Sequence, residues 1–450
     1  MENQFKNFNY FIQTFGCQMN VHESEKVAGV LEKYGMKETS DTASAQIVVI
    51  NTCTIRENAD KKIESFIGNL KALKKAGSLK CVVVFGCLVQ LEDKVKALKG
   101  KFPFIDIVFG TMNLDSFESM LLDWANDHKQ KIELKESRTA EDIKDVHRTS
   151  GVNAWVNISF GCNNFCTYCI VPYVRGREIS RPMDEILEEI DGLLNNGYKQ
   201  ITLLGQNVNS YGNDVDDNEV TFANLLRKID KLDYKFRLRF MTSHPKDISE
   251  EVVDVISKSR HICHSLHLPV QSGSNNILLA MNRKYTREHY LETIKMVKEK
   301  LPDVGLTTDI IVGFPGETEE DFQDTINLIK EVKYQQIFGF LYSRRKNTIA
   351  DGMQNQVPLA VKKERLQRLI ELERIIASEI SEGCVGSEVE VLIEGTNKSY
   401  LVGSTDQNKN VNIIVPKSVK KEELIGQFVK VKIVSSKLTV LYGEIENALS

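Results

Sequence analysis

Residues 161–169 read Gly-Cys-Asn-Asn-Phe-Cys-Thr-Tyr-Cys, so that Cys162, Cys166 and Cys169 follow a strand-like run with the spacing C-x3-C-x2-C. Three thiolates this close in sequence can hold one metal centre from a single loop. A structural zinc site takes four ligands, and the absence of a fourth Cys or His nearby disfavours a zinc knuckle. An iron–sulfur cluster held by three cysteines keeps one iron open for a further ligand, and the pattern favours such a cluster over a chance triplet.

The composition is that of an ordinary soluble protein. A chain of 450 residues with 42% hydrophobic and 27% charged residues predicts two to four domains. No run of about 18 apolar residues could span a bilayer, and the first residues, Met-Glu-Asn-Gln-Phe-Lys, lack the apolar core of a secretion signal. Nine cysteines without a signal peptide favour metal ligation in a reducing compartment over disulfides, so we expect a cytoplasmic protein with no membrane contact. The net charge of −4 means that a nucleic acid would have to be held by local basic patches.

Residues 1–128 repeat one plan, in which an apolar strand-like run ends at a cysteine and a helical stretch follows. The cysteine-ended runs are Tyr10–Cys17, Gln46–Cys53 and Cys81–Cys87, and a fourth run without a final cysteine is Ile105–Gly110. The helical stretches are Ser24–Tyr34, Glu57–Lys75, Leu91–Leu98 and Leu114–Trp124. This alternation predicts an α/β domain built on a parallel sheet.

Three of the cysteines stand at equivalent strand ends. Because parallel strands all end at one edge, we expect Cys17, Cys53 and Cys87 to converge at the carboxyl edge, where open α/β sheets bind ligands. Burial as small apolar residues is the alternative for these three, and their equivalent placement disfavours it. Cys81 begins its strand, roughly 20 Å away on the opposite edge, and is interpreted as a buried core thiol. Cys263 and Cys384 have no cysteine neighbours and are interpreted as structural.

A partial barrel is expected in the middle of the chain. The charged residues 129–149 lack apolar periodicity and are interpreted as a linker. In residues 150–380, six strand-like runs alternate with helical stretches: Trp155–Phe160, Gln200–Gly205, Arg237–Thr242, Ser265–Val270, Thr307–Phe314 and Gln336–Leu341. Six β/α units are too few to close an eight-stranded barrel, so we expect an open one that carries its chemistry on the loops after the strands. The cysteine triplet follows the first of these strands, as that rule requires.

A small β-barrel is predicted for residues 384–446. Five short alternating runs indicate it: Glu388–Ile393, Tyr400–Gly403, Val411–Val415, Gln427–Val434 and Leu438–Tyr442. Its eight lysines are matched by eight acidic residues, so any RNA binding would rest on segregation of charge and not on excess. Docking to another protein surface is the alternative role for this barrel.

Several stretches together resemble the methylthiotransferase family, and the resemblance covers nearly the whole chain. They are Thr14-Phe-Gly-Cys-Gln-Met-Asn20 with Ser24-Glu25, Asn51-Thr-Cys53, Gly86-Cys87 and Gly161–Gly176. The stretches around Cys17 and after Cys169 are most similar to the tRNA-modifying branch of that family. In addition, Val391–Thr396 and Thr405-Asp406 resemble the TRAM domain that binds RNA in this family.

The resemblance implies two 4Fe–4S clusters and S-adenosyl-L-methionine as cofactors. Cys162, Cys166 and Cys169 resemble the ligands of radical adenosylmethionine enzymes, in which the open iron binds the amino and carboxylate groups of adenosylmethionine. The second triplet, Cys17, Cys53 and Cys87, matches the ligands of an auxiliary cluster that is tied to sulfur delivery in this family.

Polar residues cluster after the predicted strands of the partial barrel, where adenosylmethionine would need donors and acceptors. The candidates are Gln206, Asn207, Ser243, His244, Gln271 and Glu317, together with Tyr168, which lies between two ligands and matches an aromatic position near adenine in related enzymes. For each polar residue the alternative is a turn or a helix cap, and for Tyr168 it is loop packing.

Basic residues at the same edge could hold an RNA backbone, although such charges more often form a solvated face. The candidates are Arg175, Arg177, Arg344 and Arg345 near the barrel mouth and Lys417, Lys420 and Lys421 in the C-terminal barrel. Relatives usually carry a proline after Tyr-Ser, whereas Tyr342-Ser343 leads here into Arg344-Arg345, so the shape of this loop is not predicted.

The resemblance implies an enzyme that replaces a C–H bond by C–SCH3 at C2 of N6-dimethylallyladenosine at tRNA position 37. A threonylcarbamoyl-adenosine tRNA or a ribosomal protein are alternative substrates. A binding module, namely an iron–sulfur RNA-binding redox sensor, is the alternative from another class. The expected partners are the tRNA anticodon loop and a reductant such as flavodoxin or ferredoxin, with the protein acting as a monomer. Neither the sulfur donor nor the order of steps follows from the sequence.

Overall fold

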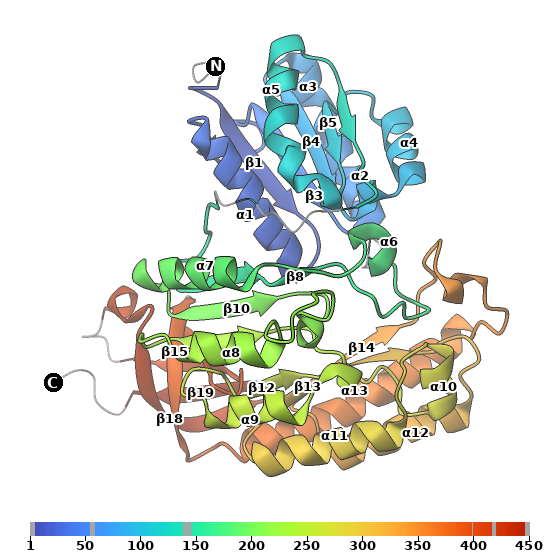
Figure 1. The fold of residues 1–450 in the computed structure, drawn as a ribbon, viewed down its shortest axis with the longest axis vertical. Helices are drawn as coiled ribbons and strands as arrows, with labels where there is room; N and C mark the ends of the chain where they lie inside the picture. Colours follow the sequence, from blue (N-terminus) through green and yellow to red (C-terminus); the bar gives the residue numbers. More distant parts are fainter. Residues whose placement is uncertain are drawn as a thin grey trace. The chain divides into compact units, whose positions relative to one another are not determined.

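The computed structural model describes residues 5–54, 59–137, 143, 146–397, 399–415 and 420–445. Two compact units emerge from the packing of the chain. The first consists of residues 1–149, 160–163 and 169–181, and the second of residues 150–159, 164–168 and 182–450. Many of the helices and strands of both are labelled in Figure 1. None of the described helices combines the length and the apolar composition that crossing a membrane requires.

The first unit is built on a six-stranded parallel sheet with the order β2-β1-β3-β4-β5-β6. Its strands are β1 (Asn9–Thr14), β2 (Lys37–Glu38), β3 (Ile47–Thr52), β4 (Cys81–Gly86), β5 (Ile107–Phe109) and β6 (Lys131–Glu133). Every residue of β3 and β4 is buried, because both faces of a parallel sheet are covered by helices. The predicted α/β domain is confirmed.

Helices pack on the two faces of this sheet. They are α1 (Gln18–Lys33), α2 (Ala59–Asn69), α3 (Lys71–Ala76), α4 (Glu92–Lys101) and α5 (Phe117–Asp127), with short 3-10 helices η1 (Leu88–Gln90) and η2 (Thr111–Ser116). Val27 of α1 and Phe117 of α5 share one apolar cluster with Phe85. Ile67 of α2 and Leu98 of α4 share the other cluster. The sheet is therefore sandwiched between helices.

The largest differences from the sequence interpretation concern helix α1 and strand β6. Helix α1 begins directly after Cys17 and not at Ser24, because buried polar residues such as Asn20, His22 and Glu23 interrupt the apolar periodicity before Ser24. Strand β6 lies inside the segment interpreted as a linker, and its pairing with β5 makes that interpretation wrong for Lys131–Glu133. The end of the same segment is also held by hydrogen bonds to helix α1. The Thr149 N–H and hydroxyl both donate to Glu25 Oε1, at 3.1 and 2.8 Å.

The core of the second unit contains the six expected β/α strands. They are β7 (Asn153–Asn157), β10 (Gln200–Leu204), β11 (Arg237–Phe240), β12 (Ser265–His267), β13 (Gly305–Val312) and β14 (Gln336–Leu341). They form two parallel three-stranded sheets, β11-β10-β7 and β12-β13-β14, and a parallel bridge between Leu238 and Ile262 connects the two. Among the described residues β7 and β14 are not paired with each other, as an open barrel requires.

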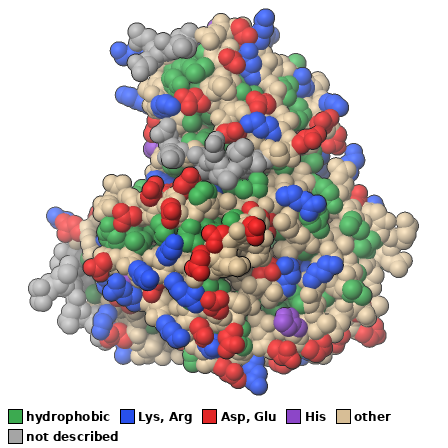
Figure 2. Space-filling model, viewed as in Figure 1, with side chains coloured by type: hydrophobic (Ala, Val, Ile, Leu, Met, Phe, Trp, Pro, Cys, Tyr) green, Lys and Arg blue, Asp and Glu red, His purple; other side chains and the backbone are tan. Residues whose placement is uncertain are grey.

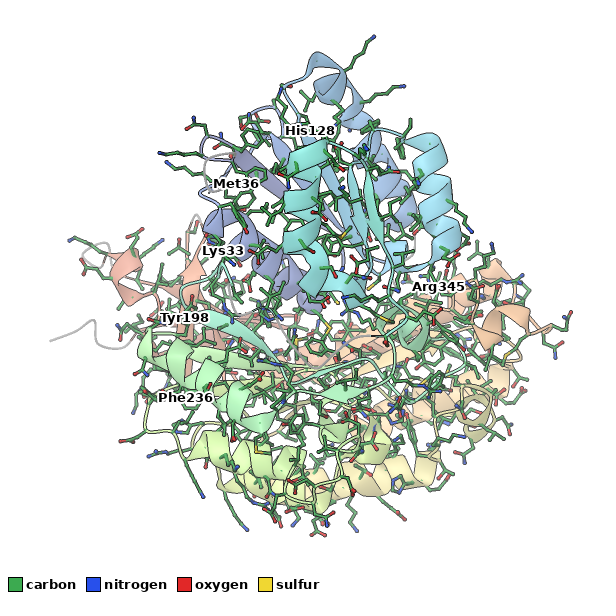
Figure 3. All side chains as sticks on the ribbon, turned by 45° about the horizontal axis from the view of Figure 1, so that its top comes forward. Lys33, Met36, His128, Tyr198, Phe236 and Arg345 are labelled. Atoms are coloured by element: carbon green, nitrogen blue, oxygen red, sulfur yellow. The ribbon has the colours of Figure 1, made fainter. Side chains whose placement is uncertain are left out.

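Helices follow each strand of this core. They are α7 (Met183–Asn195), α8 (Phe222–Asp230), α9 (Glu250–Lys258), α10 (Asn275–Ala280), α11 (Arg287–Lys300), α12 (Glu319–Val332) and α13 (Leu359–Glu382), with η3 (Val208–Ser210), η4 (Pro245–Asp247) and η5 (Ile349–Gly352) in the loops. Short elements flank the cysteine loop: β8 (Ser159–Phe160), α6 (Val171–Arg175) and β9 (Ile179–Ser180). Phe236, labelled in Figure 3, lies in the large apolar core of this unit, just before β11.

The C-terminal segment forms the predicted five-stranded barrel, closed in the order β15-β16-β17-β19-β18. Its strands are β15 (Glu388–Thr396), β16 (Leu401–Thr405), β17 (Asn410–Ile414), β18 (Phe428–Lys437) and β19 (Val440–Glu444), with η6 (Lys421–Leu424) before β18. Alternate residues such as Val391, Ile393 and Val431 fill its interior and are almost completely buried.

This barrel is docked on the amino edge of the core sheet. Arg237, the first residue of β11, donates to the Ser404 carbonyl at 2.6 Å, and Arg239 donates to the Thr405 carbonyl at 2.6 Å. The His264 N–H, just before β12, donates to Asp406 Oδ2 at 2.9 Å. Thr405 and Asp406, which resemble positions of an RNA-binding module, contact other residues of this chain.

Candidate metal centres and cofactor site

Cys17, Cys53 and Cys87 directly follow neighbouring strands of the first sheet. Strand β1 pairs with β3, and β3 pairs with β4, so the three strand ends lie side by side. The Cys87 N–H donates to the Thr52 carbonyl at 3.1 Å, which ties the second and third loops together. Burial raises the pKa of the Cys87 thiol to about 12, while the nearby Arg175 guanidinium acts to lower it. The predicted convergence at the carboxyl edge is confirmed.

Two glycines allow these loops to approach closely. Gly16 has a φ of +133°, and a Cβ there would lie 2.7 Å from the Asn20 side chain. Gly86 has a φ of +105°, and a Cβ there would lie 2.5 Å from the Thr52 carbonyl oxygen. Both conformations are in the region that favours glycine. The Gly-Cys pairs of the sequence are therefore required by the backbone on which the cysteines stand.

A buried amide network lies beside the same cysteines. Asn20 Nδ2 donates to the carbonyls of Phe15 and Thr52 at 2.9 and 3.0 Å, and to Asn51 Oδ1 at 3.0 Å. The Cys17 thiol donates to Asn20 Oδ1 at 3.5 Å. A fully satisfied network of this kind holds its loops rigidly.

Arg175 belongs to this network and not to an RNA surface. Its side chain is only 5% exposed. It donates to Glu23 Oε1 at 2.7 Å and to Asn20 Oδ1 at 3.0 Å. The prediction that Arg175 binds RNA is therefore wrong, because a buried guanidinium paired with a buried carboxylate is not available to a phosphate.

The middle of the signature loop (Gly161–Cys169) is held by the segment around α10 in the second unit. The Thr167 N–H donates to the Met281 carbonyl at 3.1 Å, and its hydroxyl donates to the Ala280 carbonyl at 2.8 Å. Asn282 Nδ2 donates to the Phe165 carbonyl at 3.0 Å. The positive φ of Phe165, at 47°, is thus stabilised from outside the loop.

Cys166 has a charged neighbour from a distant part of the sequence. Arg283 Nη1 donates to Cys166 Sγ at 3.3 Å and to the Tyr168 hydroxyl at 3.3 Å. Arg283 lies more than a hundred positions beyond the signature loop, in a turn after α10. No local pattern marks it in the sequence, because only the tertiary fold brings the two segments together.

The chemistry of the cysteine side chains bears on what the two triplets could hold. All nine are unbridged. Among the described residues, no group of three or more His, Cys, Asp or Glu side chains is arranged to hold one metal ion. Cys17, Cys53 and Cys87 are nevertheless close enough for the charge of one to affect another. Iron–sulfur clusters are held by Cys thiolates, so the donor type of both triplets fits such a cluster.

Buried polar atoms without a partner collect at the carboxyl edge of the second unit's strands. Ser159 Oγ, Asn209 Nδ2, His244 Nε2 and Gln271 Oε1 have no hydrogen-bond partner among the described residues. They follow β7, β10, β11 and β12 respectively. Leaving such an atom unsatisfied costs about 1–3 kcal/mol, so four at one edge indicate a polar ligand.

His244 is prepared to donate one hydrogen bond. Burial, assisted by Arg283 and Lys246, lowers the pKa of its imidazole to about 2, so the ring is neutral at physiological pH. Its Nδ1 accepts the Lys246 N–H at 3.3 Å, which leaves the ring proton on Nε2. Gln271 adds backbone strain at the same edge, with a φ of 71°. Both residues were predicted to bind adenosylmethionine, and their geometry suits that role.

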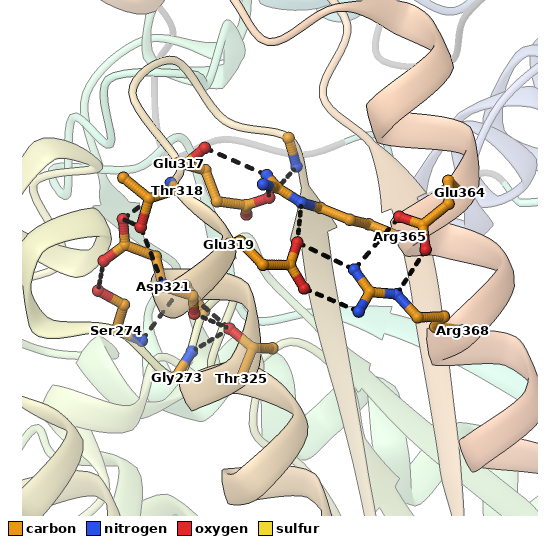
Figure 4. Close-up of polar contacts among 12 residues, drawn as sticks. Gly273, Ser274, Glu317, Thr318, Glu319, Asp321, Thr325, Glu364, Arg365 and Arg368 are labelled. Atoms are coloured by element: carbon orange, nitrogen blue, oxygen red, sulfur yellow. Dashed lines mark hydrogen bonds and ion pairs between the residues drawn. The ribbon is translucent and has the colours of Figure 1, made fainter.

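The other predicted ligands divide into two groups. Asn207 and Glu317 brace loops: Asn207 Nδ2 donates to Asp247 at 2.6 Å, and Glu317 Oε1 accepts from Arg365 at 2.8 Å (Figure 4). Burial raises the pKa of Glu317 to about 7, against the lowering effects of Gly313 and Arg365. Ser243, Gln206 and Tyr168 remain candidates. Ser243 is buried, and its hydroxyl donates to Asn209 Oδ1 at 3.1 Å. Gln206 is half-buried. The Tyr168 ring packs edge-on to the Phe314 ring, with the ring centroids 6.5 Å apart.

The predicted RNA contacts differ in exposure. Arg344 is exposed and pairs with Asp351 at 2.7 Å, and Arg345, labelled in Figure 3, is half-buried on the same loop after β14. Arg177 is exposed. Lys420 is exposed and pairs with Glu423, whereas Lys421 donates to the Ser399 carbonyl at 2.9 Å. Lys417 lies outside the described residues.

Family models match three parts of the chain. The Radical SAM superfamily matches residues 156–329, the TRAM domain matches residues 382–445, and an uncharacterised protein family, UPF0004, matches residues 9–110. These spans correspond to the core of the second unit, the small barrel and the first sheet.

Curated relatives align with almost the entire chain. The tRNA-2-methylthio-N(6)-dimethylallyladenosine synthase of Thermoanaerobacter pseudethanolicus is 48% identical over 448 residues, which is 99% of this chain and 94% of the relative. The protein of the same description from Carboxydothermus hydrogenoformans is 47% identical over 440 residues, 97% of this chain and 98% of its own.

Among solved structures, the radical S-adenosylmethionine methyltransferase TsrM from Kitasatospora setae superposes with a TM-score of 0.56 at 13% identity, over 86% of this chain and 79% of its own. The apo form of the cobalamin-dependent S-adenosylmethionine radical enzyme OxsB superposes with a TM-score of 0.52 at 13% identity, over 81% of this chain and 56% of its own. At this level of identity the likeness concerns the fold alone.

Proposed function

This chain belongs to the family of tRNA-2-methylthio-N(6)-dimethylallyladenosine synthases, and we propose that it converts N6-dimethylallyladenosine at tRNA position 37 to its 2-methylthio derivative. It is a radical SAM methylthiotransferase that uses S-adenosyl-L-methionine and a 4Fe–4S cluster. The observation that carries the proposal is the alignment over 99% of the chain with a relative of that activity. The cysteine loops at two carboxyl edges agree with it.

The residues at these edges support the chemistry in distinct ways. The C2–H bond of adenine is neither acidic nor electrophilic, so acid–base groups alone cannot replace its hydrogen. Adenosylmethionine with a reduced cluster supplies radical chemistry when bound, and the protein positions the reactants. Cys162, Cys166 and Cys169 would hold that cluster. Tyr168, His244 and Gln271 would orient adenosylmethionine, with the neutral His244 donating from Nε2 to one of its oxygens.

We assign a second 4Fe–4S cluster to Cys17, Cys53 and Cys87. Their convergence after adjacent strands, next to a buried amide network, supports this assignment. The anaerobically reconstituted protein should then contain about eight irons per chain, four for each triplet. Replacing Cys162, Cys166 and Cys169 by Ala should leave about half of that iron. A folded triple variant that kept all its iron, or lost all of it, would disprove the two-cluster assignment.

RNA contacts are proposed for Arg177, Arg344 and Arg345 near the core and for Lys417, Lys420 and Lys421 in the small barrel. On the face drawn in Figure 2, Lys and Arg side chains are interspersed with Asp and Glu. An RNA-binding surface must therefore come from a local grouping of basic side chains and not from an overall excess of positive charge. The exposed Lys420, which pairs with Glu423, shows how closely the two signs are mixed. A cytoplasmic monomer that receives electrons from a flavodoxin or ferredoxin completes the proposal.

The decisive experiment is mass analysis of tRNA nucleosides from a strain that lacks this gene. The 2-methylthio derivative should disappear while N6-dimethylallyladenosine accumulates, and the intact gene should restore the product. A gene carrying Cys166→Ala should not restore it. Unchanged nucleosides would favour a ribosomal-protein substrate, and loss of a threonylcarbamoyl-adenosine product would favour that tRNA instead. Failure of the purified, reduced protein to release 5′-deoxyadenosine would favour the redox sensor.

A further inference from the structure

Arg283 is buried among groups that do not balance its charge. Its side chain is 4% exposed. Its Nη2 donates to the Pro269 carbonyl at 2.8 Å, its Nε donates to the Tyr285 hydroxyl at 3.0 Å, and its Nη1 reaches Cys166 and Tyr168. No carboxylate among the described residues pairs with it. The sulfur of Cys166 is the one group in this set that becomes anionic at neutral pH when it binds a metal.

Other buried arginines of the chain are compensated differently. Arg175 pairs with Glu23 at 2.7 Å, and Arg365 pairs with Glu317 at 2.8 Å. Arg237 donates to the carbonyls of Ser404 and Glu390 and also lies 3.7 Å from the half-exposed Glu390 carboxylate. Burying a charge without a counter-charge costs free energy. A 4Fe–4S cluster ligated by three thiolates is anionic, and it gains a further negative charge when it is reduced. Arg283 is placed to supply the missing positive charge.

We propose that Arg283 is a positioning residue for the cluster on Cys162, Cys166 and Cys169. Its hydrogen bond to Cys166 stabilises the reduced form of that cluster, and its bonds to Tyr168 and Pro269 fix the orientation of the ligand loop. This inference rests on the proposed function, because it requires a cluster at the signature loop. Hydrogen bonds to sulfur and nearby charge are among the factors that set the potential of such clusters.

The test is a redox titration followed by electron paramagnetic resonance. It uses full-length protein in which Cys17, Cys53 and Cys87 are replaced by Ala, so that one cluster alone gives the signal. Arg283→Met should retain four irons per chain and shift the reduction equilibrium at least tenfold toward the oxidised form, which corresponds to about 59 mV for one electron. Arg283→Lys, which keeps the charge, should recover part of this shift. Adenosylmethionine should bind with an affinity within about twofold of the parent, since the charge acts through Cys166.

Arg237→Met is the matched control. It also removes a buried arginine from the second unit, but at the amino edge of β11, where the partners are two carbonyl oxygens and the half-exposed Glu390 carboxylate. It should lower thermal stability and leave the potential unchanged. A reduction potential that is the same in Arg283→Met and in the parent would overturn the proposal. If the adenosylmethionine affinity also fell more than tenfold in that case, Arg283 would act on adenosylmethionine and not on the cluster.

A loss of iron in Arg283→Met is addressed by two further variants. Arg283→Gln keeps a donor without the charge, and Arg283→Lys keeps the charge. A higher potential in the Lys variant than in the Gln variant supports the proposal, and equal potentials overturn it. A parent protein that binds no iron at the signature loop would instead overturn the proposed function, which separates the two failures.

Discussion

At the scale of single residues, the position of a cysteine relative to a strand decides its role. Cys87 follows β4 and faces two other cysteines, whereas Cys81 begins β4 and is fully buried in an apolar cluster. Burial raises the pKa of Cys81 well above its ordinary value, with Asp106 adding to the effect. A thiol held neutral in this way packs like a small apolar side chain.

Replacing Cys81, Cys263 or Cys384 by Ala should therefore leave the iron content unchanged. Each change should reduce the free energy of unfolding by about 1 kcal/mol, because only a sulfur atom is removed. Cys87→Ala, the matched variant at the other end of β4, should lose about half of the iron. Iron analysis of the reconstituted proteins checks both outcomes, and iron loss in Cys81→Ala would contradict the placement of Cys81 at the far edge.

His244 should make stability dependent on pH below neutrality. The pKa of its imidazole is about 2 in the folded protein and about 6.5 when unfolded, so the unfolded chain binds more protons between these values. The contribution of neutral His244 to stability is complete above pH 6.5 and is lost as the pH falls. At pH 5 the loss should be about 2 kcal/mol relative to pH 7.5.

Urea unfolding of the parent and of His244→Gln at both pH values checks this expectation. The variant should be less sensitive to acid by about the same 2 kcal/mol. His264, which is partly exposed and pairs with Asp303, offers a matched control, since its replacement should not remove the acid sensitivity that His244 causes. Equal acid sensitivity in the parent and His244→Gln would contradict the neutral, buried imidazole.

At the scale of the element, the turn between β4 and η1 requires glycine for two reasons. Gly86→Ala adds left-handed backbone strain and places a Cβ 2.5 Å from the Thr52 carbonyl oxygen, a contact that no side-chain rotation can relieve. Strain of this kind costs about 1–3 kcal/mol before the steric overlap is added. Because Cys87 follows immediately, the auxiliary cysteines should lose their alignment as well.

Gly86→Ala should thus lose about half of the reconstituted iron and unfold at lower temperature. Gly77→Ala is the control for strain alone, since Gly77 has a φ of 78° with nothing within 4 Å of an added Cβ. It should cost about 1 kcal/mol and keep all the iron. If Gly86→Ala retained the full iron content, the close approach of these loops would not be needed for ligation.

At the scale of the whole molecule, the C-terminal barrel is an integral part of the second unit. Its removal would take away the Ser404 carbonyl that Arg237 contacts, the Thr405 carbonyl that Arg239 contacts and the Asp406 carboxylate that accepts the His264 N–H. Truncation before residue 384 should consequently destabilise the core, and it is a poor test of RNA binding. Surface substitutions that leave the docking contacts intact are a cleaner test.

The double variant Lys420→Ala/Lys421→Ala should weaken tRNA binding and make it less dependent on salt. Each phosphate contact that is lost should reduce the slope of log affinity against log salt concentration by about 1. Lys295→Ala, on the outer helix α11 and 78% exposed, is the control and should leave the slope unchanged. Identical slopes for the parent and the double variant would remove these lysines from the proposed RNA surface and favour protein docking as the role of the barrel.

The sequence by itself determined most of the elements and the six cysteines proposed as ligands. Strand alternation, turn residues and the placement of cysteines after apolar runs are local signals, and they predicted the parallel sheet, the six strands of the open barrel and the five strands of the small one. Only the tertiary structure decided the environment of the charges. Arg175 and Arg344 look alike in the sequence, yet one is buried against Glu23 and the other is exposed. Likewise, Arg283 meets Cys166 and Asp406 meets His264 because distant segments pack together, and no local pattern encodes which buried groups will balance one another.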